Sequence, residues 1–259
     1  CRTLPSELQK EERTMIEISI SKDANELGLC AAKKAEGLIS QAISERGEAR
    51  IILSTGMSQF ETLKELVKMD VDWSKVTMFH LDEYVGLPET HIASFRKYLK
   101  ERFTSLVDLK AAYFVNGEDD VSKNIEELSA ALNEKPVDVG LIGIGENGHI
   151  AFNDPPADFE TTQAYKIVDL DTRCRMQQVG EGWFATVDDV PRQAISMCPR
   201  QIMSCRHIIS AVPHKVKSQA VYDTITKPVS PMVPATLLKK HPDWSLFLDM
   251  DSASMLLGC

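Results

Sequence analysis

The stretch Val137-Asp-Val-Gly-Leu-Ile-Gly-Ile-Gly145 decides how the rest of the chain is interpreted. Apart from Asp138, its residues are apolar or glycine, and the run stops at Gly145. Such a run is typical of a strand that is buried on both faces, and these strands occur in parallel sheets covered by helices on either side. We therefore expect an α/β fold around this segment.

Strand and helix patterns alternate on both sides of this run. In the longest helix pattern, Asp23 is a candidate cap and Gly47 is a stop signal. The alternation predicts an open, doubly wound, mostly parallel sheet with helices on both faces. We expect strands at residues 49–53, 76–81, 112–115, 164–170, 207–212 and 245–248, and helices at residues 23–46, 59–69, 94–103, 122–133, 172–180 and 215–225.

Length and composition bound the domain organisation. The 259 residues are 43% hydrophobic, which suffices for a sizeable core. No internal repeat, low-complexity tract or linker interrupts the alternating pattern. We expect residues 1–14 to form a polar N-terminal arm and residues 15–259 a single domain, and the sequence leaves a homo-oligomer open.

Charge and cysteine usage exclude several classes of protein. A net charge of −9 argues against a nucleic-acid binder, because phosphate backbones require clustered Lys and Arg. No apolar run approaches the roughly 20 residues of a membrane span, and the first residues lack the apolar segment of a signal peptide. The six scattered cysteines and scattered histidines predict a cytoplasmic protein without a disulfide framework or a metal site.

Three segments follow expected strands, at the edge where open α/β sheets bind ligands. The first is Leu53-Ser-Thr-Gly-Met-Ser58, which passes from a strand into a helix. Its backbone N–H groups and the start of the helix favour a small anion such as phosphate. In isolation, an ordinary capped turn is the commoner outcome for such a segment.

The second segment, Phe79-His-Leu-Asp-Glu-Tyr84, places Asp82 and Glu83 directly after a strand. A carboxylate at this position can face the ligand crevice and act as a base. Adjacent side chains on extended backbone point to opposite sides, so we expect at most one to face the ligand and the other to orient the loop. A solvated loop acid or a helix cap is the commoner role for such residues in isolation.

The third segment, Gly143-Ile-Gly-Glu-Asn-Gly-His149, contains a G-x-G-x-x-G pattern. No long helix pattern follows it, so a dinucleotide site is not indicated. We interpret it as a turn, supported by Gly145 and Gly148, that carries His149 to the strand ends. Asp154 is a candidate to fix the ring tautomer, as in many acid/base histidines. A structural histidine satisfied by the backbone fits the pattern equally well.

Two longer stretches carry a resemblance to a known family. Residues 79–99, FHLDEYVGLPETHIASFRKYL, and 142–156, IGIGENGHIAFNDPP, resemble the signatures of glucosamine-6-phosphate deaminases (isomerases), with a more distant likeness to 6-phosphogluconolactonases. The likeness runs in the same order from Met15 to Leu256. It implies a sheet of Rossmann-like topology. It also implies an enzyme that opens the ring of an aminosugar 6-phosphate, moves a proton from C2 toward C1 and releases ammonia to leave fructose 6-phosphate, with no cofactor or metal.

The resemblance implies roles for the residues around the proton transfer. Asp82 matches the carboxylate that takes the C2 proton, with Glu83 beside it as support. His149 matches the ring-opening acid/base, with Asn147 and Asp154 at the positions of its neighbouring acids. The usual residues there are a carboxylate and Glu, so Asn147 removes a charge and Asp154 reaches ~1.5 Å less far, one C–C bond.

The phosphate group has its own matches in the family. Lys217 matches the phosphate lysine, and Arg175 is the better match to the phosphate arginine, with Arg173 as the competitor. Without the resemblance, Lys217 would be interpreted as a solvated lysine at a helix start. A dianionic phosphate suits backbone N–H groups together with one Arg and one Lys. The loop that holds it is matched by Thr55, Gly56, Met57 and Ser58.

Further departures from the family concern the surroundings of the site. Residues 179–184 form an apparent insertion that can reshape its mouth, and His214 stands where Gly is usual. No convincing match to allosteric residues was found, so we do not expect allosteric activation.

Two other functions remain open from the sequence. A lactonase is disfavoured because Ile-Ala-Phe-Asn-Asp-Pro155 follows His149 in place of a Thr-Ala-Ser-Leu-Phe-Pro-like stretch. A non-catalytic sugar-phosphate sensor is disfavoured because the polar N-terminal residues are too few for a helix-turn-helix and because Asp82 and His149 are both present.

Overall fold

The structure, a computed structural model, describes residues 16–258, and the expected arm at residues 1–14 lies outside them. A large sheet contains β1 (Glu17–Ser21), β2 (Ala49–Leu53), β3 (Val76–His80), β5 (Ala111–Tyr113), β6 (Val139–Leu141), β9 (His207–Val212) and β10 (Trp244–Asp249). A small sheet contains β4 (Asp82–Tyr84), β7 (Tyr165–Asp169) and β8 (Gln193–Met197).

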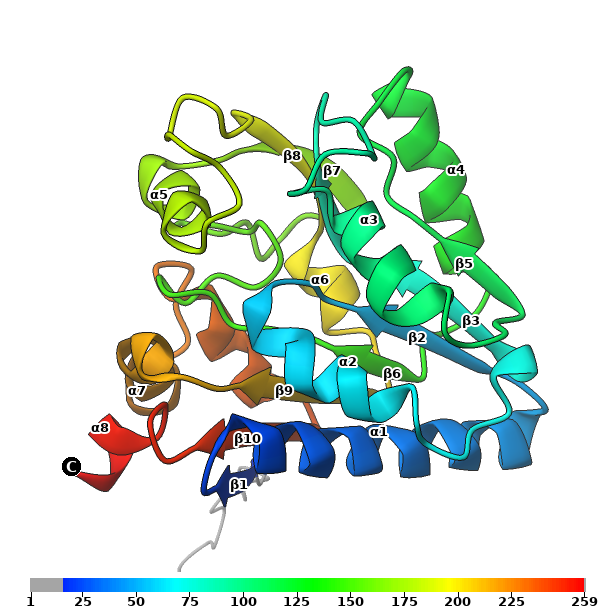
Figure 1. Ribbon diagram of the computed structural model, residues 1–259, viewed down its shortest axis with the longest axis horizontal. Coiled ribbons are helices and arrows are strands. Elements are labelled where there is room, and N and C mark those ends of the chain that lie inside the picture. Colours follow the sequence, from blue (N-terminus) through cyan, green and yellow to red (C-terminus); the bar gives the residue numbers. More distant parts are fainter. Residues whose placement is uncertain (1–15, 259) are drawn as a thin grey trace, which may run out of the picture.

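Helices connect most of these strands (Figure 1). The α-helices are α1 (Ala24–Arg46), α2 (Phe60–Leu66), α3 (Phe95–Leu99), α4 (Val121–Asn133), α5 (Thr172–Gly180), α6 (Pro199–Ile202), α7 (Ser218–Thr226) and α8 (Ser254–Leu257). Short helical turns are η1 (Met57–Gln59), η2 (Trp73–Lys75), η3 (Lys100–Thr104), η4 (Lys215–Lys217) and η5 (Pro234–Lys240).

The large sheet is parallel throughout, in the order β1-β10-β9-β6-β2-β3-β5. Strand β2 lies in the interior of the sheet. The next strands along the chain, β3 and β5, lie on one side of β2, and the later strands β6 and β9 lie on its other side. The order in which strands are added reverses between β2 and β6. In open α/β sheets, a crevice forms at such a point, outside the carboxyl ends of the two strands. The topology therefore places a ligand crevice beside residues 54 and 142.

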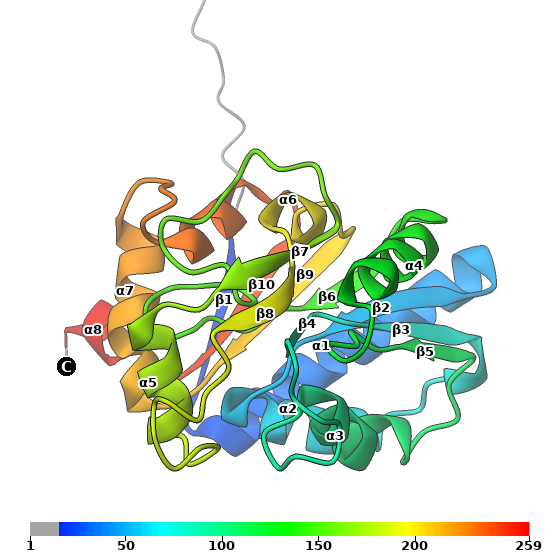
Figure 2. The same cartoon turned by 90° about the horizontal axis from the view of Figure 1, so that it is seen from above.

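Both faces of the large sheet are covered, as the alternating pattern predicted. Ile51 and Leu53 pack on one face with apolar residues of α1, α2 and α3, whereas Ile52 and Phe79 pack on the other with α4, α6 and α7. Figures 1 and 2 show α1 and α2 on one side of the sheet and α4 and α6 on the other. The doubly wound α/β prediction is confirmed.

Helix α1 begins and ends at the expected signals. The Asp23 carboxylate accepts a hydrogen bond from the backbone N–H of Glu26 (2.9 Å), which satisfies one of the free donors of the first turn. Gly47 has φ +78°, the left-handed conformation that terminates many helices. The helix is therefore delimited by local chemistry at both ends.

The small antiparallel sheet is the main departure from the predicted elements. β4 pairs with β8, and β8 pairs with β7. The sequence pattern indicated a strand at β7 but none at β1, β4 or β8. β4 starts only one residue after β3 ends, so that the chain passes from the large sheet into the small one at Leu81. This passage positions the residue that follows, Asp82.

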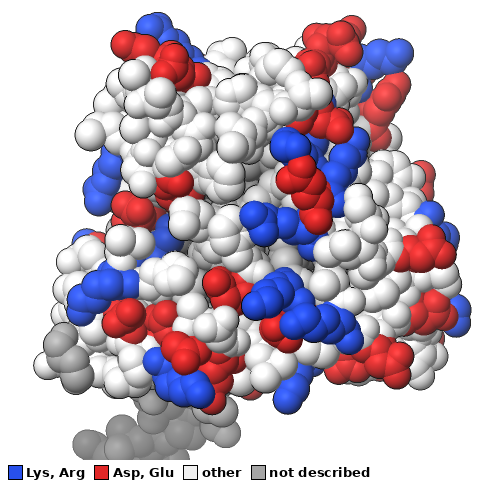
Figure 3. Space-filling model, in the orientation of Figure 1, with Lys and Arg blue, Asp and Glu red and all other residues white. Residues whose placement is uncertain are grey.

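Surface charge is mixed on the face drawn in Figure 3, where Lys and Arg are interspersed with Asp and Glu. On this face the net charge of −9 is therefore not gathered into one acidic field. Within residues 16–258, no helix combines the length and apolar character needed to cross a bilayer.

Candidate active site

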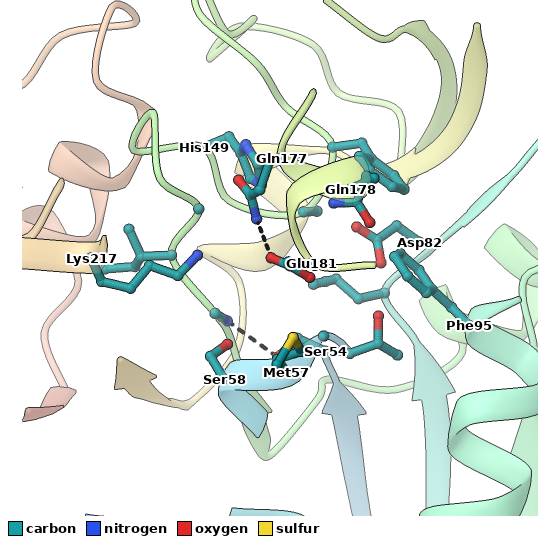
Figure 4. A pocket seen from close by; sticks show the side chains of 18 residues that line it. Ser54, Met57, Ser58, Asp82, Phe95, His149, Gln177, Gln178, Glu181 and Lys217 are labelled. Carbon is teal, nitrogen blue, oxygen red and sulfur yellow. Dashed lines mark hydrogen bonds between the residues drawn. The ribbon is translucent and has the colours of Figure 1, made fainter. Parts of the chain in front are cut away.

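A cleft lies at the carboxyl ends of β2, β3 and β6, the edge at which open α/β sheets bind their ligands. We call the residues contributed after these strands the sheet-edge wall: residues 54–58, Asp82, residues 143–145 and His149. Opposite them, Gln177, Gln178 and Glu181, from α5 and the residue after it, form what we call the helix wall. Figure 4 shows the side chains that line the cleft.

The turn after β2 presents its backbone to the cleft. Gly56 has φ +98°, which a residue with a Cβ adopts only with strain, and it precedes the 3₁₀ turn η1. Ser54 Oγ accepts a hydrogen bond from the Gly143 N–H (3.2 Å), and Gln59 donates to the Ala211 carbonyl (3.1 Å). These bonds fix the turn. Its residues that line the cleft are Ser54, Thr55, Gly56, Met57 and Ser58.

Asp82 and Glu83 point in different directions, as expected for adjacent residues on extended backbone. Asp82 lines the cleft, although only 6% of its surface is exposed. Burial, together with the nearby charge of Glu83, raises the pKa of the Asp82 carboxyl well above its usual value. A raised pKa brings a carboxylate closer to the range in which it accepts and returns protons near neutrality.

Glu83 is buried on the far side and holds the following loop. Its carboxylate accepts hydrogen bonds from the Ser94 hydroxyl (2.9 Å) and from the backbone N–H groups of Phe95 (3.2 Å) and Arg96 (2.8 Å). The Arg96 guanidinium lies 3.3 Å from it. Glu83 therefore orients the loop and the start of α3 rather than facing the cleft.

The glycine turn after β6 brings His149 into the cleft. A Cβ on Gly145 would lie 2.2 Å from His149 Nε2, so the imidazole occupies the space that a side chain at 145 would need. Gly148 has φ +80°, and a Cβ there would lie 2.9 Å from Val233. The placement of the ring thus requires Gly145, whereas Gly148 is required by its backbone conformation and by the contact with Val233.

Asp154 and Asn147 lie behind the imidazole rather than in the cleft. Asp154 Oδ1 is 3.1 Å from His149 Nδ1, with the two groups not aligned for a linear hydrogen bond. Asn147 donates to Asp154 (3.0 Å) and accepts from the His149 backbone N–H (3.0 Å). Burial raises the pKa of Asp154, but His149 and Asn147 together outweigh it and hold the pKa below its usual value. An anionic Asp154 can orient the ring.

Cys174 completes a cluster around Asp154. Its thiol, the Asp154 carboxylate and the His149 ring offer donor atoms that all lie within 4.8 Å of one another. Burial and the adjacent Asp154 raise the pKa of the Cys174 thiol strongly, so the thiol is protonated beside the Asp154 carboxylate. The cluster is suited to hold Asp154 beside the imidazole.

Lys217 reaches the cleft from η4, the turn after β9. Only 6% of its surface is exposed, and within residues 16–258 no hydrogen bond or ion pair of its ammonium group is found. Burial lowers the pKa of Lys217, while the carboxylates of Glu181 and Glu146 oppose that shift. His214 has φ +80°, which agrees with the glycine usual at its position. A buried cation facing a cleft favours an anionic ligand.

The two arginine candidates lie outside the cleft lining. The Arg175 guanidinium donates to the Val187 carbonyl and is 4.0 Å from Asp188. Arg173 lines a separate cavity together with Glu146 and Lys227. The structure therefore brings neither arginine to the turn at residues 54–58, and among residues 16–258 no other arginine lines the cleft.

The helix wall is the part of the site that the sequence did not predict. Tyr84 donates from its hydroxyl to Gln178 Oε1 (2.8 Å), and Gln177 donates to Glu181 Oε1 (2.7 Å). The apparent insertion at residues 179–184 was the available signal, since Glu181 lies within it. Gln177 and Glu181 are also four residues apart, the spacing of side chains on one helix face.

The other predicted residues meet at one place. The sheet-edge wall and Lys217 bring together Thr55, Gly56, Met57, Ser58, Asp82, Gly145 and His149, and Glu83, Gly148, Asn147 and Asp154 support them from behind.

Comparison with known proteins agrees with this geometry. Residues 22–246 match the family described as glucosamine-6-phosphate isomerases/6-phosphogluconolactonase. A glucosamine-6-phosphate deaminase from Listeria monocytogenes is 35% identical over 88% of this chain and 96% of its own length. One from Lactobacillus delbrueckii subsp. bulgaricus is 32% identical over 93% of this chain and 100% of its own.

Solved structures show the same relationship. A monomeric glucosamine-6-phosphate deaminase superposes with a TM-score of 0.84 at 26% identity, covering 93% of this chain and 100% of its own. A 6-phosphogluconolactonase from Trypanosoma brucei superposes with a TM-score of 0.75 at 16% identity, covering 93% and 99%, and so shares the fold. The chain therefore belongs to the family of glucosamine-6-phosphate isomerases and 6-phosphogluconolactonases.

Proposed function

We propose that this protein is a glucosamine-6-phosphate deaminase, converting glucosamine 6-phosphate and water into fructose 6-phosphate and ammonia. The observation that carries the proposal is the arrangement of a buried carboxylate, Asp82, and an imidazole, His149, in one cleft with a backbone turn and the unpaired ammonium of Lys217. Relatives at 32–35% identity over about nine-tenths of the chain support it.

Each group has a task in this reaction. The turn at residues 54–58 and Lys217 bind the phosphate, since backbone N–H groups and a buried cation both favour a dianion. His149 moves the proton between the C1 hydroxyl and the ring oxygen as the ring opens. Asp154, through its contact with the imidazole, is proposed to orient the ring for this transfer.

Asp82 carries out the isomerisation. It removes the proton from C2, and protonation at C1 then gives an imine at C2 of the ketose. Water adds to this imine and ammonia leaves, so that the substrate gains one water and loses one ammonia with no net oxidation. A carboxylate with a raised pKa suits a step in which the same group takes up and returns a proton.

A panel of sugar phosphates tests the proposal. The purified protein should release ammonia from glucosamine 6-phosphate and form fructose 6-phosphate in equal amount. Galactosamine and mannosamine 6-phosphates report the preferred epimer, and N-acetylated sugars are the negative controls. Hydrolysis of 6-phosphogluconolactone without ammonia release would replace the proposal by a lactonase, and sugar-phosphate binding without either product would indicate a sensor.

We also infer a cytoplasmic location and a small-molecule partner. The cysteines in the described part of the chain carry free thiols, which a reducing compartment maintains: Cys30, Cys174, Cys198 and Cys205. A single cleft-bound phosphate ester fits the overall negative charge, because the site needs positive charge only locally.

A further inference from the structure

Glu181 presents a rigidly held carboxylate to the cleft. Its Oε1 accepts a hydrogen bond from Gln177 Nε2 (2.7 Å), and its Oε2 accepts one from Trp183 Nε1 (3.1 Å). Gln177 in turn accepts from the backbone N–H of Glu146 (3.3 Å), in the turn that carries His149. Both carboxylate oxygens are thus positioned by neutral donors on the protein.

The Glu181 carboxylate forms no ion pair with the described residues. Within residues 16–258, no Lys or Arg lies at ion-pair distance from it, and the two donors it has are uncharged. In the described part of the chain, the ionisable groups that line the cleft are two carboxylates, Asp82 and Glu181, with His149 and Lys217. In the view of Figure 4, the Glu181 carboxylate is turned into the cleft between Lys217 and Asp82.

A bound phosphate makes this unpaired charge more costly. Glu181 acts electrostatically on Lys217, which lines the same cleft. When a phosphate dianion pairs with Lys217, Glu181 lies near additional negative charge, and the bound ligand displaces water that would solvate its carboxylate. A carboxylate in that position is unfavourable unless the ligand supplies a cation of its own. An aminosugar phosphate does so through its protonated amino group, whereas an alcohol or an acetamide does not.

We propose that Glu181 is a specificity-determining residue that recognises the ammonium group of the substrate and so selects free aminosugar phosphates over their hydroxy and N-acetyl analogues. This inference rests on the proposed function and adds to it. Gln177 and Trp183 hold the carboxylate in place, and Asp82 and His149 remain the groups that move protons.

Binding measurements separate this role from catalysis. Two open-chain ligands, 2-amino-2-deoxyglucitol 6-phosphate and glucitol 6-phosphate, differ at C2 and lack the carbonyl needed for turnover. Calorimetry with the full-length protein should show at least tenfold tighter binding of the amine, and Glu181→Gln should reduce this ratio to about two by weakening the amine. Glu181→Asp, which keeps the charge, should retain most of the preference.

Glu146→Gln is the matched control. Glu146 also acts on Lys217 but does not line the cleft, so its substitution should leave the amine-to-alcohol ratio unchanged. An unchanged ratio in Glu181→Gln, or equal weakening of both ligands, would overturn the inference. If the wild type releases ammonia but binds the amine and the alcohol equally well, only the proposed role of Glu181 is refuted. Absence of both ammonia release and sugar-phosphate binding refutes the proposed function and the inference together.

Discussion

The sheet-edge wall and the helix wall of the cleft are held in place by different kinds of interaction. The sheet-edge wall follows strands of one parallel sheet, and backbone hydrogen bonds such as Ser54 N–H to Leu141 O (3.0 Å) fix its segments to each other. The helix wall depends on side chains, namely the hydrogen bond of Tyr84 to Gln178 and the packing of Tyr84 against Phe184. The proposed proton transfer thus belongs to the part fixed by the sheet, and the proposed discrimination between ligands belongs to the part fixed by side chains.

The largest effect is expected for Asp82, the proposed proton acceptor in the sheet-edge wall. Asp82→Asn removes the proton acceptor and should lower kcat by roughly 10²–10⁴-fold, with phosphate-ester binding largely intact. Ammonia release and calorimetry measure the two quantities. Full activity in this variant would remove Asp82 from the mechanism, and an equal loss of binding would assign it to recognition.

The same substitution should stabilise the fold at neutral pH. The folded protein raises the pKa of Asp82, so the folded state favours the protonated form and loses stability as pH rises through that pKa. Asn avoids this cost, and thermal melting at pH 7 should show a higher Tm, by about 2–4 °C for each kcal/mol gained. The difference from wild type should shrink at acidic pH, where Asp82 is itself protonated. A lower Tm at pH 7 would contradict this.

The second largest effect is expected for a substitution that fills the space occupied by the His149 imidazole. In Gly145→Ala, the new Cβ would lie 2.2 Å from His149 Nε2, so the ring must move. A displacement of about 1 Å can cost roughly 10²-fold in rate, and we expect kcat to fall by that order. Gly37→Ala in α1 is the control, since no atom lies within 4 Å of its Cβ position and its activity should be unchanged. Wild-type kcat in Gly145→Ala would show that the ring need not occupy this place.

A smaller effect is expected for the phosphate lysine. Lys217→Ala removes the unpaired buried ammonium, and the KM for glucosamine 6-phosphate should rise about tenfold, the value of one charge-assisted hydrogen bond of about 1.5 kcal/mol. Lys215→Ala is the matched control, because Lys215 lies on the same turn but donates to Ser254 (2.7 Å) outside the cleft. If KM is unchanged in Lys217→Ala, the phosphate binds elsewhere.

The smallest effect tests the helix wall. Tyr84→Phe removes the hydroxyl that donates to Gln178 Oε1 (2.8 Å) and leaves the ring packed. Steady-state kinetics should show a change of a few-fold in kcat/KM, and unfolding should lose about 1 kcal/mol, since one buried hydrogen bond is removed. An effect as large as that of Gly145→Ala would abolish the proposed contrast between the two walls.

The sheet-edge wall could be predicted from the sequence because its signals are local. Each of its segments directly follows a strand, and parallel strands end at one edge, so the residues after Leu53, Leu81 and Ile142 had to meet. The opposite orientations of Asp82 and Glu83 followed from the alternation of side chains on extended backbone. Gly145 and Gly148 were identified as supports, but the contact of a missing Cβ with the imidazole required coordinates.

The helix wall could not be predicted because its position depends on contacts distant in sequence. β4 is three residues long and pairs with β8, more than a hundred residues away, so neither strand has a strong local pattern. Helix α5 was predicted at residues 172–180, where it lies, but nothing in its own residues indicated which face covers the cleft. Arg175 was proposed as a phosphate ligand from the family resemblance, and its guanidinium instead contacts the loop at residues 187–188.

The passage of the chain at Leu81 has a consequence for how this protein can change. The Leu81 N–H donates to Leu53 in the large sheet (3.3 Å), and its carbonyl accepts from Met197 in the small one (3.0 Å), so the backbone before Asp82 is held by both sheets. Residues 171–190 carry no strand of either sheet. A substitution of an exposed side chain in this segment can therefore change the ligand preference while both sheets still hold the backbone that carries Asp82.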